Sequence, residues 1–302
     1  MKFKLTLRKL PKFNSPEKAF CTCPPKYNIN PYLGRCNHNC VYCYAVKFPS
    51  FIGSTKPRTN LLESIEVMVK NTKQKLPVMF SDCTDPYQPM EKEFKITRKC
   101  LEVLAKHGFP ILIVTKSDLV TRDLDVLRKT RSVVSISLTT LKDEVARLVE
   151  PNAPSPEKRI RALQFITGKG VTTTVRVDPI IPFLNDDEKD FRLLISTVAS
   201  IGIKQVTIST LKPVKGFFTK LKKINPKLSE KLEKIYEEGE WIMGYKYLPE
   251  NFRFNFLKKF RSVVLSYGLK FASCREGFPE YNNSICDGTG FLQTQVKLLN
   301  HV

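Results

Sequence analysis

Short runs of β-branched and apolar residues alternate with helical segments over most of this chain, and this alternation restricts the fold more than any other feature. The runs lie at 28–34, 76–82, 109–115, 132–138, 172–178 and 204–210. Between them, apolar residues recur at three- and four-residue spacing near 61–74, 91–107, 121–130, 156–168 and 187–201. Strands this rich in Val and Ile are typical of a parallel sheet that is covered on both faces.

Six strand–helix repeats predict an α/β fold, a partial (β/α)6 TIM-like barrel. A doubly wound open sheet is the competing arrangement, because periodicity alone does not separate the two. We predict three parts: a basic N-terminal segment (1–26), the partial barrel (27–213) and a helical, basic C-terminal extension packed on the barrel (214–302). The extension includes one more strand-like run at 269–274.

Polar residues and prolines are concentrated where the predicted strands end, in the stretches CTDPYQPME, TKSD, SLTT, DPIIP and TLKP. The carboxyl ends of the strands form the active site in parallel barrels, so these loops predict a functional rim. Ordinary turn chemistry is the alternative explanation, since Asp, Pro and Ser are common turn residues.

The chain is strongly basic, with 50 Lys and Arg against 29 Asp and Glu and a net charge of +21. Residues 1–60 hold eleven of these cations and a single acidic residue, Glu17. A positive field of this kind favours a polyanion, and we predict nucleic acid as the partner. A solvated basic surface without such a partner is the alternative.

Other features of the sequence predict a cytoplasmic protein. It contains no run of about 18 apolar residues, so we predict no membrane span. The first residues lack the apolar stretch and cleavage site of a secretory signal. Nine cysteines in a chain of this size do not form a typical disulfide scaffold, and such residues in a reducing compartment more often bind metal or perform chemistry.

Three of the cysteines, Cys36, Cys40 and Cys43, lie in the stretch CNHNCVYC after the first predicted strand. Thiolates at this spacing can bind three irons of a [4Fe–4S] cluster and leave the fourth iron without a protein ligand. An open coordination position is what distinguishes a catalytic metal site from a closed structural one. A zinc site with a distant fourth ligand is the alternative.

The CxxxCxxC spacing, with Tyr42 before the third cysteine, resembles the signature of radical S-adenosylmethionine (radical SAM) enzymes. The stretches YCYA, TDPYQPME, TKSDLVTRD, SLTT and PIIP further resemble the spore photoproduct lyase-like branch, which is related to DNA repair. The resemblance extends from about Tyr27 to Pro213. It implies S-adenosyl-L-methionine as a cofactor, a 5′-deoxyadenosyl radical, and a reductase or ferredoxin-type electron donor.

Within that branch, Cys83 matches a hydrogen-donating cysteine, and Tyr42 and Tyr44 match tyrosines that pass the hydrogen atom onward. The resemblance therefore implies a catalytic role for all three residues. A buried thiol also behaves as a small apolar residue, and the tyrosines could simply shield the cluster from water.

Five further residues are candidates for binding the cofactor. Lys116 and Ser137 match residues that contact its carboxylate and ribose, and Thr84 and Asp85 occupy the loop that receives its amino group. Arg176 lies inside a strand pattern, where an unpaired charge would be costly, so we predict that it faces the substrate or cofactor.

Four more cysteines, Cys21, Cys23, Cys274 and Cys286, lie outside the predicted barrel strands. The segments before the first strand and after the last one can approach each other, so these thiols could form a second metal or iron–sulfur site. Inert or redox-labile thiols are the alternative.

These features together predict a radical SAM enzyme, a lyase, that acts on nucleic acid. Radical SAM modification of RNA or a peptide is a second hypothesis. A non-catalytic basic metal-binding protein that binds nucleic acid is the third. The substrate-gripping C-terminal hairpin of the spore enzymes has no counterpart in the sequence, so the resemblance does not extend to the spore lesion itself.

Overall fold

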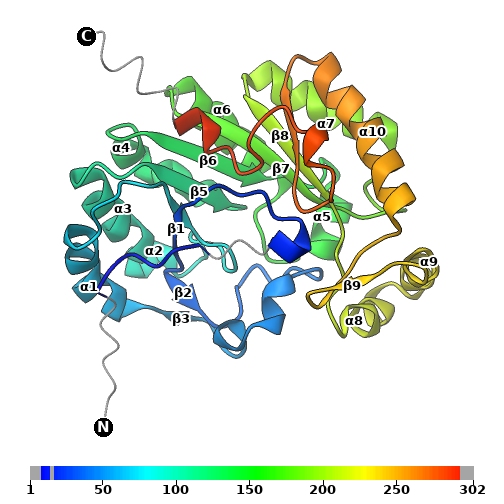
Figure 1. Cartoon of the computed structure of the whole chain (residues 1–302), viewed down its shortest axis with the longest axis horizontal. Helices are drawn as coiled ribbons and strands as arrows, with labels where there is room; N and C mark the ends of the chain where they lie inside the picture. Colours follow the sequence, from blue (N-terminus) through cyan, green and yellow to red (C-terminus); the bar gives the residue numbers. More distant parts are fainter. Residues whose placement is uncertain (1–7, 14–16, 293–302) are drawn as a thin grey trace.

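The computed structural model describes residues 8–13 and 17–292, and these form one parallel sheet of seven strands (Figure 1). The strands are β1 (Tyr27–Ile29), β4 (Val78–Phe80), β5 (Ile111–Thr115), β6 (Ser132–Ser137), β7 (Thr172–Ile180), β8 (Gln205–Thr210) and β11 (Lys270–Ser273), paired in that order. All neighbouring pairs in this sheet are parallel.

The strand order distinguishes the partial barrel from the doubly wound sheet. A doubly wound sheet reverses its strand order at a switch point, whereas these strands follow one another across the sheet without reversal. Because strand–helix–strand crossovers are right-handed, sequential crossovers place their helices on one face. The α/β partial barrel is therefore confirmed, and it gains a seventh strand, β11, from the segment that we assigned to the C-terminal extension.

Apart from the short helix α2 (Glu91–Phe94), the helices of the described residues lie around the outside of the curved sheet (Figure 1). They are α1 (Thr59–Lys70), α3 (Ile96–Lys106), α4 (Leu124–Leu127), α5 (Asp143–Val149), α6 (Pro156–Gly168), α7 (Glu188–Ile201), α8 (Phe217–Ile224), α9 (Pro226–Tyr236) and α10 (Glu250–Ser266). No helix in the described part of the chain is both long and apolar enough to span a membrane.

Two predicted elements are divided in the structure. The predicted strand 28–34 breaks at Pro31, which lacks an amide hydrogen, and β2 (Tyr32–Leu33) pairs instead with β3 (Lys56–Pro57). The predicted helix 91–107 is interrupted at Lys95, which has a φ of 51° and separates α2 (Glu91–Phe94) from α3. The Glu91 carboxylate accepts hydrogen bonds from the amides at residues 97 and 98, so it caps the start of α3.

Shorter elements complete the described fold. The predicted helix 121–130 is the 3-10 helix η4 (Asp118–Asp123) followed by α4. A small hairpin joins β9 (Trp241–Ile242) to β10 (Tyr245–Lys246). Further 3-10 turns are η1 (Glu17–Ala19), η2 (Tyr44–Lys47), η3 (Pro49–Phe51) and η5 (Pro279–Tyr281).

Both ends of the described chain pack on the inner face of the sheet. Met79, Leu112 and Val133 form an apolar cluster with Leu292, against which Phe13 also packs. Residues 8–13 run beside β1, where Lys12 forms an antiparallel bridge to Tyr27. Residues 1–7 and 14–16 of the predicted basic segment lie outside the described residues. The three-part division of the chain stays a prediction.

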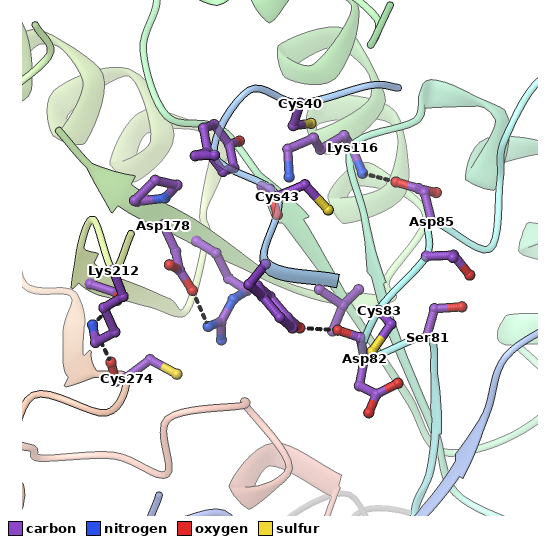
Figure 2. A pocket seen from close by; sticks show the side chains of 18 of the residues that line it. Cys40, Cys43, Ser81, Asp82, Cys83, Asp85, Lys116, Asp178, Lys212 and Cys274 are labelled. Carbon is purple, nitrogen blue, oxygen red and sulfur yellow. Dashed lines mark hydrogen bonds and ion pairs between the residues drawn. The ribbon is translucent and has the colours of Figure 1, made fainter. Parts of the chain in front are cut away.

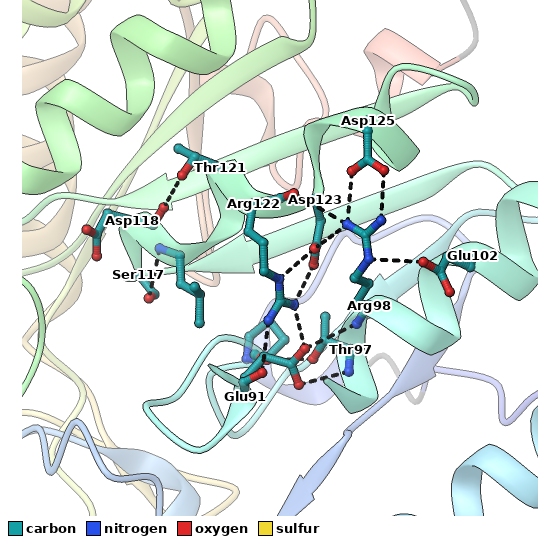
Figure 3. A network of polar contacts seen from close by, with 12 residues as sticks. Glu91, Thr97, Arg98, Glu102, Ser117, Asp118, Thr121, Arg122, Asp123 and Asp125 are labelled. Carbon is teal, nitrogen blue, oxygen red and sulfur yellow. Dashed lines mark hydrogen bonds and ion pairs between the residues drawn. The ribbon is translucent and has the colours of Figure 1, made fainter. Parts of the chain in front are cut away.

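A network of ion pairs forms around Glu91, Arg122 and Asp123 (Figure 3). Through Glu91 it supports β2, the strand that leads into the three-cysteine loop. Glu91 is fully buried and accepts hydrogen bonds from Arg122 at 2.7 Å and from the Tyr32 hydroxyl on β2. Arg98 and Arg122 both bind Asp123, at 3.0 and 2.7 Å. The network therefore connects α2, α3 and η4 to the entry of the loop.

Replacing Glu91 by alanine should lower the free energy of unfolding by about 3 kcal/mol, because Arg122 and Tyr32 lose a buried charged partner. Glu93→Ala, on the exposed side of the same short helix, is the matched control and should change it little. Urea unfolding followed by circular dichroism measures both values. Equal losses in the two variants would contradict this role of the network.

Candidate active site

The carboxyl ends of the central strands open onto a cavity of about 360 Å³. All the candidate residues named from the sequence line it: Cys21, Cys23, Cys36, Cys40, Tyr42, Cys43, Tyr44, Cys83, Thr84, Asp85, Lys116, Ser137, Arg176, Cys274 and Cys286. Figure 2 shows Cys40, Cys43 and Lys116 in one part of the cavity and Lys212 with Cys274 in another. The loops that follow strands therefore form a shared rim, as in other parallel barrels.

The three-cysteine loop begins at Gly34, directly after β2. Gly34 has a φ of +73°, and a Cβ atom there would lie 2.0 Å from the carbonyl oxygen of Ser54, so only glycine fits. Further along, the amide of Asn37 donates to Gln88 at 2.7 Å and the amide of Val41 donates to the carbonyl of Val149 at 2.8 Å. The loop is thus held by the β4–α2 connection on one side and by the end of α5 on the other.

The electrostatics of two of the three thiols, Cys36 and Cys40, suit a positively charged metal centre. Burial raises the pKa of Cys36 to about 12, and the negative charge of Asp85 adds to this effect. Burial also raises the pKa of Cys40 to about 12, against the opposing charge of Lys116. Metal binding deprotonates such thiols because the cation compensates their charge. Three soft sulfur donors on one loop fit an iron–sulfur cluster.

Asp85 lies at the centre of the hydrogen bonds around this loop. Its carboxylate accepts from the Thr115 hydroxyl at 2.6 Å and from the amide of Lys116 at 2.7 Å. One of its oxygens lies 3.4 Å from Nδ1 of His38, a buried residue between the first two cysteines. The neighbouring Thr84 donates its hydroxyl hydrogen to the carbonyl of Tyr32 at 3.0 Å. Asp85 therefore joins the cysteine loop to the end of β5.

A second polar network lies behind Cys40. Glu150 accepts a hydrogen bond from the Tyr42 hydroxyl and forms an ion pair with Arg159 at 2.6 Å. The Nζ of Lys116 lies 4.0 Å from Glu150 and 5.5 Å from the centre of the Tyr42 ring. Burial opposes the charge of Lys116, but its electrostatic interactions with Cys40 and Glu150 raise its pKa above the ordinary value. Lys116 is therefore a cation at the cavity wall.

The structure separates the two tyrosines proposed as hydrogen carriers. The Tyr44 hydroxyl donates to the carbonyl of Asp82, the residue before Cys83. Tyr42 instead contacts Glu150, across the loop. Burial and the adjacent Asp82 carboxylate raise the pKa of Cys83 well above its usual value, so this residue keeps its S–H hydrogen. Cys83 and Tyr44 are neighbours at this end of β4.

At the opposite end of the cavity, Ser137 on β6 is in register with Arg176 on β7. Arg176 forms an ion pair with Asp178 at 2.5 Å. Lys212 forms another ion pair with Glu276 from the C-terminal region, and Glu276 is buried. Sequence reasoning did not name Asp178, Lys212 or Glu276 as site residues. The strand-end stretches DPIIP and TLKP contain the first two and were the available signal.

The comparison with known families identifies the chain. The model of the radical SAM superfamily matches residues 30–195, which include the cysteine loop and the strands from β2 to β7. This chain belongs to the radical SAM superfamily. The superfamily consists of enzymes, so the predicted enzyme class is confirmed at this level.

Sequence comparison finds relatives of this radical SAM protein, two of them in Methanocaldococcus jannaschii and Pseudomonas phage M6. An uncharacterized protein of Methanocaldococcus jannaschii is 36% identical over 167 residues, which cover 54% of this chain and 63% of that protein. The chain thus spans less than two thirds of the length of this relative. The radical SAM Nalpha-GlyT isomerase of Pseudomonas phage M6 is 22% identical over 255 residues, with 82% of this chain and 53% of that protein covered.

Two solved structures share the fold of this radical SAM protein. Spore photoproduct lyase complexed with dinucleoside spore photoproduct superposes with a TM-score of 0.68 at 16% identity, covering 88% of this chain and 80% of the lyase. Streptococcus suis SuiB bound to the precursor peptide SuiA superposes with a TM-score of 0.58 at 14% identity, covering 87% of this chain and 53% of SuiB. The expected likeness to spore photoproduct lyase is therefore confirmed for the fold.

Proposed function

We propose that this radical SAM protein holds a [4Fe–4S] cluster on Cys36, Cys40 and Cys43, binds S-adenosyl-L-methionine in the adjoining cavity, and acts on nucleic acid. The observation that carries the proposal is that the three thiols line the same cavity as the polar ends of β4 to β7. When bound, the cluster and S-adenosyl-L-methionine supply a 5′-deoxyadenosyl radical that abstracts hydrogen from the substrate.

The protein's own residues bind and orient the cofactor in this proposal. The Lys116 ammonium attracts the methionine carboxylate, and the buried Ser137 hydroxyl hydrogen-bonds the ribose. The Thr84 oxygen, which already donates its hydrogen to Tyr32, accepts from the methionine amino group. Asp85 is a positioning residue, because its oxygens accept from Thr115 and Lys116.

Cys83 supports a lyase-like reaction with hydrogen return. Its thiol lines the cavity and keeps its hydrogen at neutral pH, so it can donate a hydrogen atom to a substrate radical. Tyr44 is the better placed of the two tyrosines to restore that hydrogen, because its hydroxyl lies at the Cys83 loop. Tyr42 holds the Glu150 carboxylate beneath Lys116 instead.

Anaerobic reconstitution tests the proposal directly. The protein with iron and sulfide should bind about four of each per chain at the loop. Addition of S-adenosyl-L-methionine and a chemical reductant should then release 5′-deoxyadenosine, measured by chromatography and mass spectrometry. If the protein forms the cluster but releases no 5′-deoxyadenosine, the proposed chemistry is wrong and the cluster is an electron-transfer or structural centre.

The basic N-terminal segment supports nucleic acid as the substrate class. Arg8, Lys9 and Lys12 are exposed, and their segment runs beside β1 to Phe13, which lines the cavity. Phosphates of a nucleic acid could follow this segment while the reacting base enters the cavity. A base inside a duplex would have to leave the stack to do so.

Charge reversal of Arg8, Lys9 and Lys12 to glutamate should weaken duplex DNA binding and reduce the slope of log affinity against log salt concentration by about three, one for each lost phosphate contact. Fluorescence anisotropy at several salt concentrations measures both quantities. The control reverses three exposed cations near the outer helix α6: Lys158, Arg161 and Lys169. Equal effects of the two triple variants on duplex binding would argue against a nucleic-acid path along residues 8–13. If the protein binds no duplex at all, RNA or a peptide becomes the leading substrate class.

A further inference from the structure

The two ends of the described chain meet through cysteines. Cys21 and Cys23 precede β1, and Cys274 and Cys286 follow β11, although β1 and β11 are opposite edges of the sheet. The Sγ atoms of Cys23 and Cys286 are 3.7 Å apart. The Cys21 thiol also contacts that of Cys23, and the Cys274 thiol contacts that of Cys286. Four thiols from the two ends therefore form one continuous cluster at the cavity wall.

Contacts other than the thiols hold the two segments in place. Lys26 and Asp287 form an ion pair at 2.9 Å, and both side chains are almost fully buried. The Thr207 hydroxyl on β8 donates to the carbonyl of Cys286 at 2.7 Å. On the N-terminal side, Arg275 donates to the carbonyl of Ala19 at 3.1 Å. Figure 1 shows this N-terminal turn (blue) beside the C-terminal loop (red).

The distance between the central sulfurs indicates which kind of centre the cluster fits. A disulfide would need about 2.05 Å between the sulfurs. Zinc–sulfur bonds of about 2.3 Å in a tetrahedron place neighbouring sulfurs about 3.8 Å apart. In a four-iron cluster each thiolate binds a different iron, which spreads the sulfurs further. The separation of 3.7 Å between Cys23 and Cys286 matches two ligands of one tetrahedral ion.

The charges around the cluster also suit a tetrathiolate site. A divalent ion with four thiolates carries a net charge of −2, which burial would penalise without nearby cations. Lys26 lies beside Cys23, and Arg176 lies near Cys274 and Cys286. Arg176 also donates to the carbonyl of Cys286 at 3.4 Å. Each cation also pairs with a carboxylate, Lys26 with Asp287 and Arg176 with Asp178, so the two cations offset part of the charge of the proposed site.

We propose that Cys21, Cys23, Cys274 and Cys286 bind one Zn²⁺ ion that joins the two chain ends across the open side of the partial barrel. In the structure, no three His, Cys, Asp or Glu side chains of the described residues are arranged to bind one metal ion. The outer thiols of Cys21 and Cys274 therefore rotate toward the central pair when the ion binds. Four protein ligands leave no open position, so the ion is structural and forms one wall of the substrate cavity.

The first test uses the triple variant Cys36→Ala/Cys40→Ala/Cys43→Ala, which removes the three-cysteine site, so the result does not depend on radical chemistry. Purified without chelator, this variant should contain one zinc per chain and no acid-labile sulfide, by inductively coupled plasma mass spectrometry and sulfide assay. Adding Cys23→Ser and Cys286→Ser should remove the zinc. Adding Cys100→Ser, in the core of α3, should not.

A second measurement uses the unmutated protein and needs no variant to fold. Under native conditions, the four outer cysteines should resist alkylation by N-ethylmaleimide until a chelator removes zinc, and should react after the chelator is added. Peptide mass spectrometry identifies the modified residues. Iron with sulfide on the outer cysteines, a Cys23–Cys286 disulfide, or alkylation that does not respond to chelator would each overturn the zinc proposal.

Discussion

Replacing Cys36, Cys40 and Cys43 together by alanine should reduce the release of 5′-deoxyadenosine from S-adenosyl-L-methionine by about three orders of magnitude or more. The reason is structural: these are the three thiols that the loop after β2 brings to the carboxyl ends of the strands. Under the proposed function, the variant keeps Lys116, Ser137 and Thr84 to bind the cofactor but lacks the proposed ligands of the cluster that cleaves it. The loss should appear in the maximal rate at saturating cofactor.

Iron content and cofactor binding distinguish this result from simple unfolding. The triple variant should lose the iron and sulfide of the native protein yet still bind S-adenosyl-L-methionine weakly through the strand-end residues. Cys100→Ala is the matched control, because Cys100 is fully buried in α3 and does not line the cavity. It should keep its iron and its activity. A triple variant that retains activity would place the cluster elsewhere and refute the assignment of the loop.

Replacing Arg159 by methionine should lower the free energy of unfolding by about 3–5 kcal/mol at neutral pH. The Arg159 and Glu150 side chains are both buried, and their ion pair of 2.6 Å lies directly behind Cys40 and Tyr42. Methionine fills similar space but leaves the Glu150 carboxylate with Lys116, at 4.0 Å, as its nearest remaining cation. Arg161→Met, on the exposed face of the same helix, should change stability little.

The pH dependence of this difference gives an independent check. Burial opposes the charge of Glu150, but Arg159 and Lys116 keep its pKa below the ordinary value of 4.5. A carboxylate with a lowered pKa stabilises the folded state above its unfolded pKa, and that contribution disappears as the pH falls through the folded value. The difference in the free energy of unfolding between the native protein and the Arg159→Met variant should therefore become smaller below about pH 4.5. A gap that does not change with pH would show that packing, rather than charge, causes the loss.

Local patterns in the sequence predicted much of the site. The spacing of Cys36, Cys40 and Cys43 is a property of one short loop, and the polar residues after each strand follow from parallel topology. The family resemblance pointed to Lys116 and Ser137, and the cost of an unpaired charge inside a strand pointed to Arg176; all three line the cavity. The sequence did not predict the buried ion pair of Glu150 with Arg159. The helical periodicity of a segment does not indicate which of its side chains forms an ion pair with another segment.

Helix and strand breaks show a second limit of local reasoning. Apolar spacing runs through 91–107 without interruption, but the buried Glu91 carboxylate captures the amides of residues 97 and 98 and starts a new helix there. The benefit of that cap depends on Arg122 and Tyr32, which arrive from other elements. Hydrophobic periodicity describes one segment at a time, so it does not predict hydrogen-bond partners that come from other elements.

The sequence by itself determined the α/β repeat, the three-cysteine loop and the membership in a radical SAM family, because each rests on residues that are close together in the chain. Tertiary structure decided the strand order, the addition of β11 as a seventh strand, and the separation of Tyr42 from the Cys83–Tyr44 pair. It also brought Cys21 and Cys23 to Cys274 and Cys286 across the open side of the sheet. These features depend on contacts between segments far apart in sequence, and such contacts form only when the whole core has packed.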